Sequence, residues 1–213
     1  MEIKYYVIKV CNPINPYRMS KFLIVLNLLA LPFSWAQTPL VSGNYDSELL
    51  IAYNTSTKKI TGYYENGTGD NNQFSCIFYL EGQVTGKSFL VQTYFPNDKT
   101  DDLQKGTINL ISPKQINLQL AEDHGGCWNV QHFSEEPVSF ELRKETHWIQ
   151  INYVITPKSF MYQDSKGKKK MKSFLVKNDI VCVERIENEM AYCQYSGTKI
   201  TKGWISLHDL NSL

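Results

Sequence analysis

Apolar and polar residues alternate along most of this chain in short runs, and helical periodicity is almost absent. The runs are rich in Ile, Val, Tyr, Phe and Thr, and they are separated by Gly, Asn, Asp and Pro, which is typical of β-strands joined by turns. We therefore predict an all-β protein. The first expected strands are "ELLIAYN", "KITGYYE", "FSCIFYLEG", "KSFLVQTYF", "GTINLI", "QINLQL" and "VSFELRK".

These segments predict an N-terminal antiparallel meander domain over residues 37–145. Neighbouring segments pair as hairpins around short turns, and such a sheet buries one face best by closing into a small barrel or by folding over as a sandwich. Alternate aromatic residues are expected to fill the core while the others cover the outside. A small barrel is either filled by its side chains or holds one small molecule, and both alternatives stay open here.

The pattern changes in the last third of the chain, over residues 146–213. The segments "SFLVKNDIVCVERI", "MAYCQY" and "TKGWISLHDL" resemble the bacterial SH3-like (SH3b) domains, although that family usually has Gly at the position of Asn178 and often Trp at that of Met190. The resemblance implies a C-terminal SH3-like barrel. Because such domains are often appended to proteins that work at the cell wall, it also implies a role at the bacterial cell envelope.

The N-terminal region has the features of a secretory signal peptide. Lys21 precedes an apolar run over residues 22–33, and "SWA" follows with small residues at the positions that a signal peptidase inspects. We expect cleavage to remove residues 1–36 and natural translation to start at Met19. The apolar run is too short for a stable membrane span, so the expected location is periplasmic or secreted.

The cysteines predict two disulfides. Four of them remain after the leader is removed, an even set in an exported chain. In "IVCVERIENEMAYCQY" a two-residue turn at Glu187 and Asn188 would place Cys182 directly opposite Cys193 across a hairpin. This favours a Cys182–Cys193 bridge and leaves Cys76 to pair with Cys127.

The charge of the chain after the leader is nearly balanced, with 18 basic and 20 acidic residues. That balance argues against a general nucleic-acid binder. The distribution is uneven, because residues 37–145 hold 8 basic and 14 acidic residues while residues 146–213 hold 10 and 6. The two parts are therefore expected to attract one another or to meet differently charged partners.

The densest cluster of chemically active side chains is "EDHGGCWNVQHF", residues 122–133. Cys127 with His124 or His132 as base would form a thiol nucleophile, and the same three residues with Asp123 would form part of a zinc site. In an oxidising compartment, however, a disulfide removes the thiol of Cys127. We predict a disulfide-anchored loop that presents polar and aromatic side chains, with no catalytic centre, metal or cofactor.

The protein is therefore expected to act by binding and not as an enzyme. The expected partner is cell-wall peptide or a wall-associated protein, and the alternative is a secreted wall-degrading enzyme that this protein inhibits. An enzyme or metal-binding protein that uses the 123–132 loop is the third hypothesis. The lysine-rich segment "SKGKKKMK", residues 165–172, is expected to be a solvated loop, with contact to anionic wall polymer or phosphate as the alternative. The candidate binding residues are Trp128, His124, Asp123 and His132 in the disulfide loop and Tyr162 and Tyr195 on the SH3-like barrel.

Overall fold

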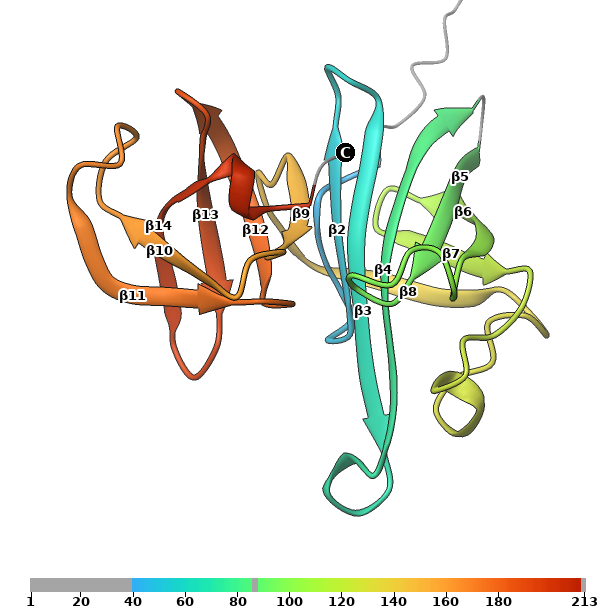
Figure 1. The fold of residues 1–213 in the computed structure, drawn as a ribbon. Helices are drawn as coiled ribbons and strands as arrows, with labels where there is room; N and C mark the ends of the chain where they lie inside the picture. The colour runs from blue at the N-terminus through green and yellow to red at the C-terminus, as the bar shows by residue number, and fades with distance from the viewer. Residues whose placement is uncertain (1–39, 86–87, 212–213) are drawn as a thin grey trace, which may run out of the picture. The chain divides into compact units, whose positions relative to one another are not determined.

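The computed structural model describes residues 40–85 and 88–211, and in these residues the chain is all-β, as predicted (Figure 1). Two antiparallel sheets account for fourteen strands, and the other regular elements of the described residues are three short 3-10 helices. The predicted signal peptide, residues 1–36, with its possible start at Met19, lies outside the described residues. Within the described residues, no helix is long and apolar enough to cross a membrane.

The first eight strands form a closed barrel in which each strand pairs with the next along the chain. β1 also pairs antiparallel with β8, which closes the sheet. The predicted meander is therefore confirmed, and it closes as a barrel and does not fold over as a sandwich. The strands are β1 (Gly43–Tyr45), β2 (Leu49–Asn54), β3 (Lys59–Thr68), β4 (Phe74–Thr85), β5 (Ser88–Tyr94), β6 (Gln104–Ser112), β7 (Gln115–Leu120) and β8 (Val138–Glu145).

Side chains fill the interior of the barrel. Inward and outward positions alternate along each strand, so that Phe78 lies in the core while its neighbour Tyr79 lies on the outer face. The ring of Tyr64 is at the centre of the packing, with its centroid 5.0 Å from those of both Phe78 and Phe133 and 6.0 Å from that of Phe140. Aromatic rings thus occupy the space where a small ligand was the alternative.

The last six strands form a second antiparallel sheet in the order β11-β10-β14-β13-β12-β9. This sheet has its own apolar core, and Asn178, at the position where the SH3b family usually has Gly, has a φ of 75°. A positive φ is the property that Asn shares with Gly. Membership of the SH3-like family stays a prediction. The strands are β9 (Gln150–Tyr153), β10 (Lys158–Tyr162), β11 (Lys170–Val176), β12 (Ile180–Glu187), β13 (Met190–Ser196) and β14 (Ile200–Ser206).

The two sheets share a third apolar cluster. Tyr79 and Tyr94 from the outer face of the barrel pack in this cluster with Ile151 and Tyr153 of β9 and with Trp148 just before it. Residues 40–85 and 88–211 accordingly belong to one compact unit. The outward-facing aromatic residues Tyr79 and Tyr94 therefore cover the outside of the barrel, as predicted, and they pack against the second sheet.

Candidate functional site

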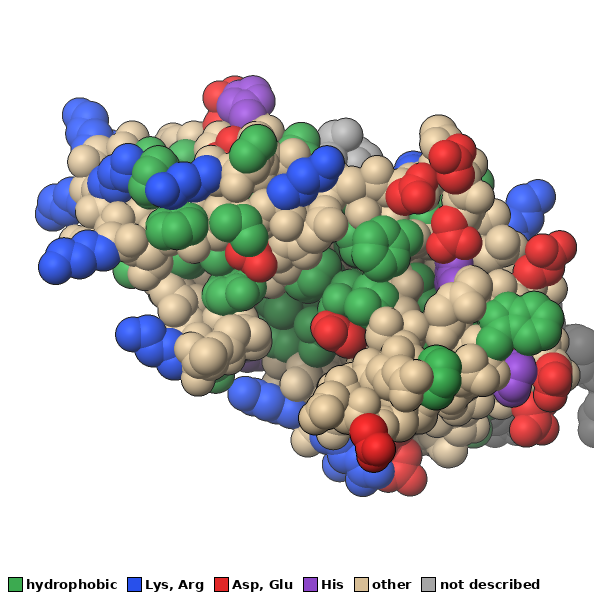
Figure 2. Space-filling view, turned by 60° about the horizontal axis from the view of Figure 1, so that its bottom comes forward, with side chains coloured by type: hydrophobic (Ala, Val, Ile, Leu, Met, Phe, Trp, Pro, Cys, Tyr) green, Lys and Arg blue, Asp and Glu red, His purple; other side chains and the backbone are tan. Residues whose placement is uncertain are grey.

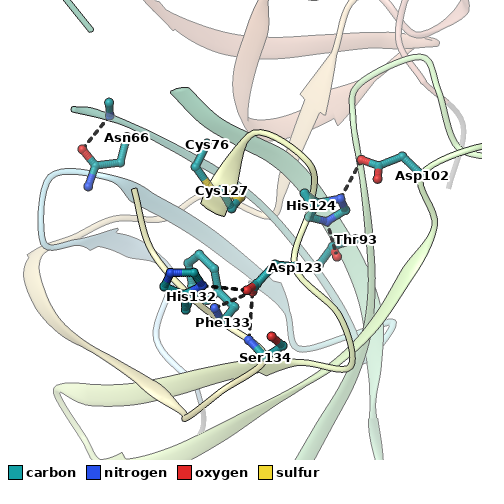
Figure 3. Close-up of a disulfide and its surroundings, with 11 residues drawn as sticks. Asn66, Cys76, Thr93, Asp102, Asp123, His124, Cys127, His132, Phe133 and Ser134 are labelled. Carbon is teal, nitrogen blue, oxygen red and sulfur yellow. Dashed lines mark hydrogen bonds and ion pairs between the residues drawn. A yellow bond between two sulfur atoms is a disulfide. The ribbon is translucent and has the colours of Figure 1, made fainter. Parts of the chain in front are cut away.

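The segment with the richest chemistry lies between β7 and β8 and contains the 3-10 helix η2 (Cys127–Asn129). A disulfide joins Cys127 to Cys76 of β4, and both cysteines are buried (Figure 3). This pairing confirms the prediction and removes Cys127 as a thiol nucleophile or thiolate ligand. The backbone of this segment also packs tightly against β4 at Gly126, where a Cβ atom would lie 2.3 Å from the carbonyl oxygen of Ser75.

Asp123 ties the two ends of this loop together (Figure 3). Its Oδ1 accepts hydrogen bonds from the backbone N–H groups of Phe133 at 2.7 Å and Ser134 at 2.9 Å, and its Oδ2 lies 3.1 Å from Nδ1 of His132. Burial disfavours the charged carboxylate, but these donors outweigh burial and lower the pKa of Asp123. With its side chain only 5% exposed, Asp123 holds the loop and does not offer a contact surface.

His124 is an internal anchor of the same loop. Its side chain is 3% exposed and stacks on Phe78, with ring centroids 5.2 Å apart. Its Nε2 lies 2.8 Å from Oγ1 of Thr93 on β5, and its Nδ1 lies 2.6 Å from Oδ2 of Asp102. The prediction that His124 contacts a partner is wrong, because the imidazole is enclosed between the loop and the barrel.

Thr93, His124 and Asp102 stand in the order hydroxyl, imidazole and carboxylate, which is the order of a hydrolase triad. Such a triad needs a nucleophile that a substrate can reach, whereas Thr93 is 0% exposed. The arrangement therefore fits a buried network that fixes the loop. Sequence reasoning did not connect Thr93 and Asp102 with His124, because they come from different segments and meet His124 only in the folded chain.

Trp128 stands out from the loop into solvent. Its residue is 64% exposed, although the neighbouring Cys127 is fully buried in the disulfide. Among its ring neighbours is His132, whose centroid is 6.4 Å away in an edge-to-face arrangement and whose side chain is 42% exposed. Of the four loop residues predicted to bind, these two are the ones that a partner can reach.

The side chains of the loop are not arranged as the zinc site that was the alternative for Asp123, His124, Cys127 and His132. Cys127 is in the disulfide, His124 pairs with Thr93 and Asp102, and His132 pairs with Asp123. Across residues 40–85 and 88–211, no three His, Cys, Asp or Glu side chains are grouped so that they could hold a metal ion.

The prediction of a second disulfide is wrong. Cys182 and Cys193 are both free and buried. The hairpin turns at Asn188 and Glu189, which have φ of 50° and 61°, one residue later than predicted, and its register shifts after Val183. As a result Cys182 lies opposite Gln194, and Cys193 faces the other side of the sheet. Cys182 packs in the cluster shared with the barrel, and Cys193 packs in the core of the second sheet.

Tyr162 and Tyr195, the two candidate binding residues of the predicted SH3-like barrel, lie on opposite faces of the second sheet. Tyr162 is directly opposite Trp204, whose ring packs against that of Tyr192. Tyr195 is three residues after Tyr192 on the same strand, and it packs against the core, with its hydroxyl 3.3 Å from Asp179. The two tyrosines therefore cannot line one groove.

Comparison with known proteins adds no further constraint on the site. No protein-family model matches this chain, and neither a curated protein nor a solved structure matches it.

Proposed function

We propose that this is an exported, non-catalytic binding protein of the bacterial cell envelope that recognises a protein partner through the Trp128 loop. The observation that carries the proposal is the exposure of Trp128, at 64%, on a segment whose supports are buried. Tryptophan is one of the residues that are enriched among the few that carry most of the binding energy at protein interfaces. The disulfide and the Asp123 and His124 contacts fix the loop beforehand, so little conformational entropy is lost on binding.

The charge around the loop favours a partner with a basic surface. Residues 37–145 hold 14 acidic residues against 8 basic ones, and exposed Glu135 and Glu136 follow the loop directly. Long-range attraction would speed association with a positively charged rim. A secreted wall-degrading enzyme that this loop plugs is the specific form of the proposal that we favour, because a fixed protruding loop suits a cleft.

Direct recognition of cell-wall peptide by the second sheet is a weaker candidate. It rests on the resemblance to SH3b domains, and the two tyrosines chosen for it do not share a face. We therefore place the partner-binding role in the disulfide loop.

Capture from an envelope extract, with purified peptidoglycan in parallel, tests the proposal. The bait is the protein lacking residues 1–36, compared with Trp128→Ala and with the control Ile111→Ala, which alters a 55% exposed apolar residue on β6. We expect a protein that wild type and control retain and that Trp128→Ala loses, followed by inhibition of that protein if it is a wall hydrolase. Retention that is equal for all three baits, or hydrolysis of peptidoglycan by the bait itself, would contradict the proposal.

A further inference from the structure

The hairpin of β10 and β11 concentrates positive charge. Residues 158–177 contain seven lysines and one carboxylate, that of Asp164. Asp164 is occupied by its own loop, because its carboxylate accepts hydrogen bonds from the backbone N–H groups of Lys166, Lys168 and Lys169. Burial opposes the ionised form, but these donors prevail and lower the pKa of Asp164, so the carboxylate stays charged and engaged. We call residues 158–177 the lysine hairpin.

The lysine hairpin also exposes apolar side chains on one face. Phe160 of β10 is directly opposite Phe174 of β11, and Lys158 is opposite Val176, so all four side chains share a face. Leu175, which points the other way, is in the core. Phe174 is 47% exposed and Val176 is 44% exposed, so two neighbouring apolar side chains on one face of the strand are both open to solvent.

Cations and rings interleave on this face. Nζ of Lys158 lies 4.1 Å from the ring centroid of Phe174, and Nζ of Lys170 lies 3.1 Å from that of Phe160. In the described part of the chain, the lysines that form salt bridges are Lys99 and Lys202, neither of which belongs to the hairpin. The charge of the lysine hairpin is thus left without carboxylate partners.

The exposure of Phe174 and Val176 shows that this face is open, and β11, which carries them, is the edge strand of the second sheet. Figure 2 shows Lys and Arg side chains gathered on one side of the molecule, with hydrophobic side chains between them. Clustered like charges repel one another, and a surface of negative charge would relieve that repulsion. An apolar phase next to those charges would in addition cover Phe174 and Val176.

We propose that the lysine hairpin docks on membranes that contain anionic lipids. Phosphate groups of the lipids meet the lysines, whose aliphatic stems and charged ends suit the headgroup region. Phe174 and Val176 enter the interface between headgroups and acyl chains, as apolar residues of peripheral proteins do. A soluble polyanion would satisfy the lysines but leave these two side chains in water, and this is why the lipid surface fits better.

Sedimentation with vesicles tests this docking. The protein lacking residues 1–36 is mixed with vesicles of phosphatidylcholine alone or of phosphatidylcholine with phosphatidylglycerol. We expect binding to the second kind, weakened by salt and not displaced by inorganic phosphate. Lys166→Gln, Lys168→Gln and Lys172→Gln should each lower the partition coefficient about five-fold, which corresponds to about 1 kcal/mol per lysine near an anionic surface. Phe174→Ser should lower it further without loss of folding, checked by circular dichroism.

Matched changes on the barrel serve as controls. Lys114→Gln and Ile111→Ser alter an exposed lysine and an exposed apolar residue outside the lysine hairpin, and they should leave vesicle binding unchanged. Equal binding to both kinds of vesicle, or no effect of Phe174→Ser, would overturn the proposal. So would displacement of the protein from vesicles by a short single-stranded oligonucleotide that itself depends on Phe174, since the face would then be a nucleic-acid site.

Discussion

The hydroxyl of Tyr79, on the outer face of the barrel, donates a hydrogen bond of 2.9 Å to the carbonyl oxygen of Ile151 in the second sheet. The backbone N–H of Ile151 in turn donates a hydrogen bond of 2.7 Å to Oγ1 of Thr61, which is also on the barrel. Both backbone polar groups of Ile151 are therefore satisfied by barrel side chains inside a buried cluster. Buried polar groups that lose such partners are costly, so these two bonds fasten β9 to the barrel.

Tyr79→Phe should therefore destabilise the whole protein. The carbonyl of Ile151 would stay buried without its donor, at a cost of about 1 to 3 kcal/mol. The control is Tyr63→Phe, since the Tyr63 hydroxyl bonds to the exposed carboxylate of Glu65 and its loss should cost less. Urea unfolding followed by fluorescence and circular dichroism should give one coincident transition. Two separate transitions would show that the sheets unfold independently.

The two free thiols should be unreactive in the folded protein. Burial, with a contribution from nearby negative charge, raises the pKa of both Cys182 and Cys193 to about 12, so neither is a thiolate near neutral pH. A thiol reagent at pH 8 should label neither cysteine in the native chain lacking residues 1–36, and should label both after denaturation. A peptide map without reduction that found these two cysteines bridged would contradict the register of β12 and β13.

Loss of the Cys76–Cys127 disulfide should lower the free energy of unfolding of the whole protein and not only loosen the loop that it anchors. The bridge spans a sequence separation of 51, and closing such a loop stabilises by about 4 kcal/mol in the chain-entropy model. The free energy of unfolding of Cys76→Ser/Cys127→Ser, compared with that of the oxidised wild type, measures this. The double variant avoids a free thiol that could exchange, and an unchanged stability would count against the bridge.

His124→Ala should strongly lower the free energy of unfolding and Trp128→Ala should leave it almost unchanged, although the two residues are close in sequence. His124→Ala leaves a cavity beside Phe78 and removes the partner of Thr93 and Asp102, so we expect a loss of about 2 to 4 kcal/mol. Trp128→Ala alters an exposed side chain and should change stability by less than about 0.5 kcal/mol. Thermal unfolding of both variants decides this, and a destabilised Trp128→Ala would remove the basis for the proposed recognition loop.

The contribution of Asp123 should depend on pH with a definite sign. Its pKa is lowered in the folded state, so folding favours the ionised form, and the stabilisation is present above the unfolded value of about 3.9. It is lost as pH falls through the folded pKa. The difference in unfolding free energy between wild type and Asp123→Asn should thus be constant near neutrality and shrink below about pH 4. A difference that grew in acid would contradict the assigned hydrogen bonds.

The strands and most turns of this protein could be predicted from the sequence because they depend on neighbours. Alternation and turn residues specify which segments are extended, and consecutive hairpins pair with the segment next to them. The pairing of Cys76 with Cys127 was also predicted, but partly through an elimination whose premise was wrong. The error came from a turn displaced by one residue and an irregularity after Val183, and neither leaves a clear signal in the local pattern.

What the sequence by itself determined, then, is the all-β composition and the order of the strands. Only the tertiary structure decided that the meander closes on itself, that Cys182 and Cys193 face opposite sides, and that His124 is an anchor while Trp128 is exposed. The physical reason is that exposure and pairing depend on residues far away in the chain. Thr93 and Asp102 meet His124 only after the barrel has closed, and a shift of one residue in a strand turns every side chain to the other face.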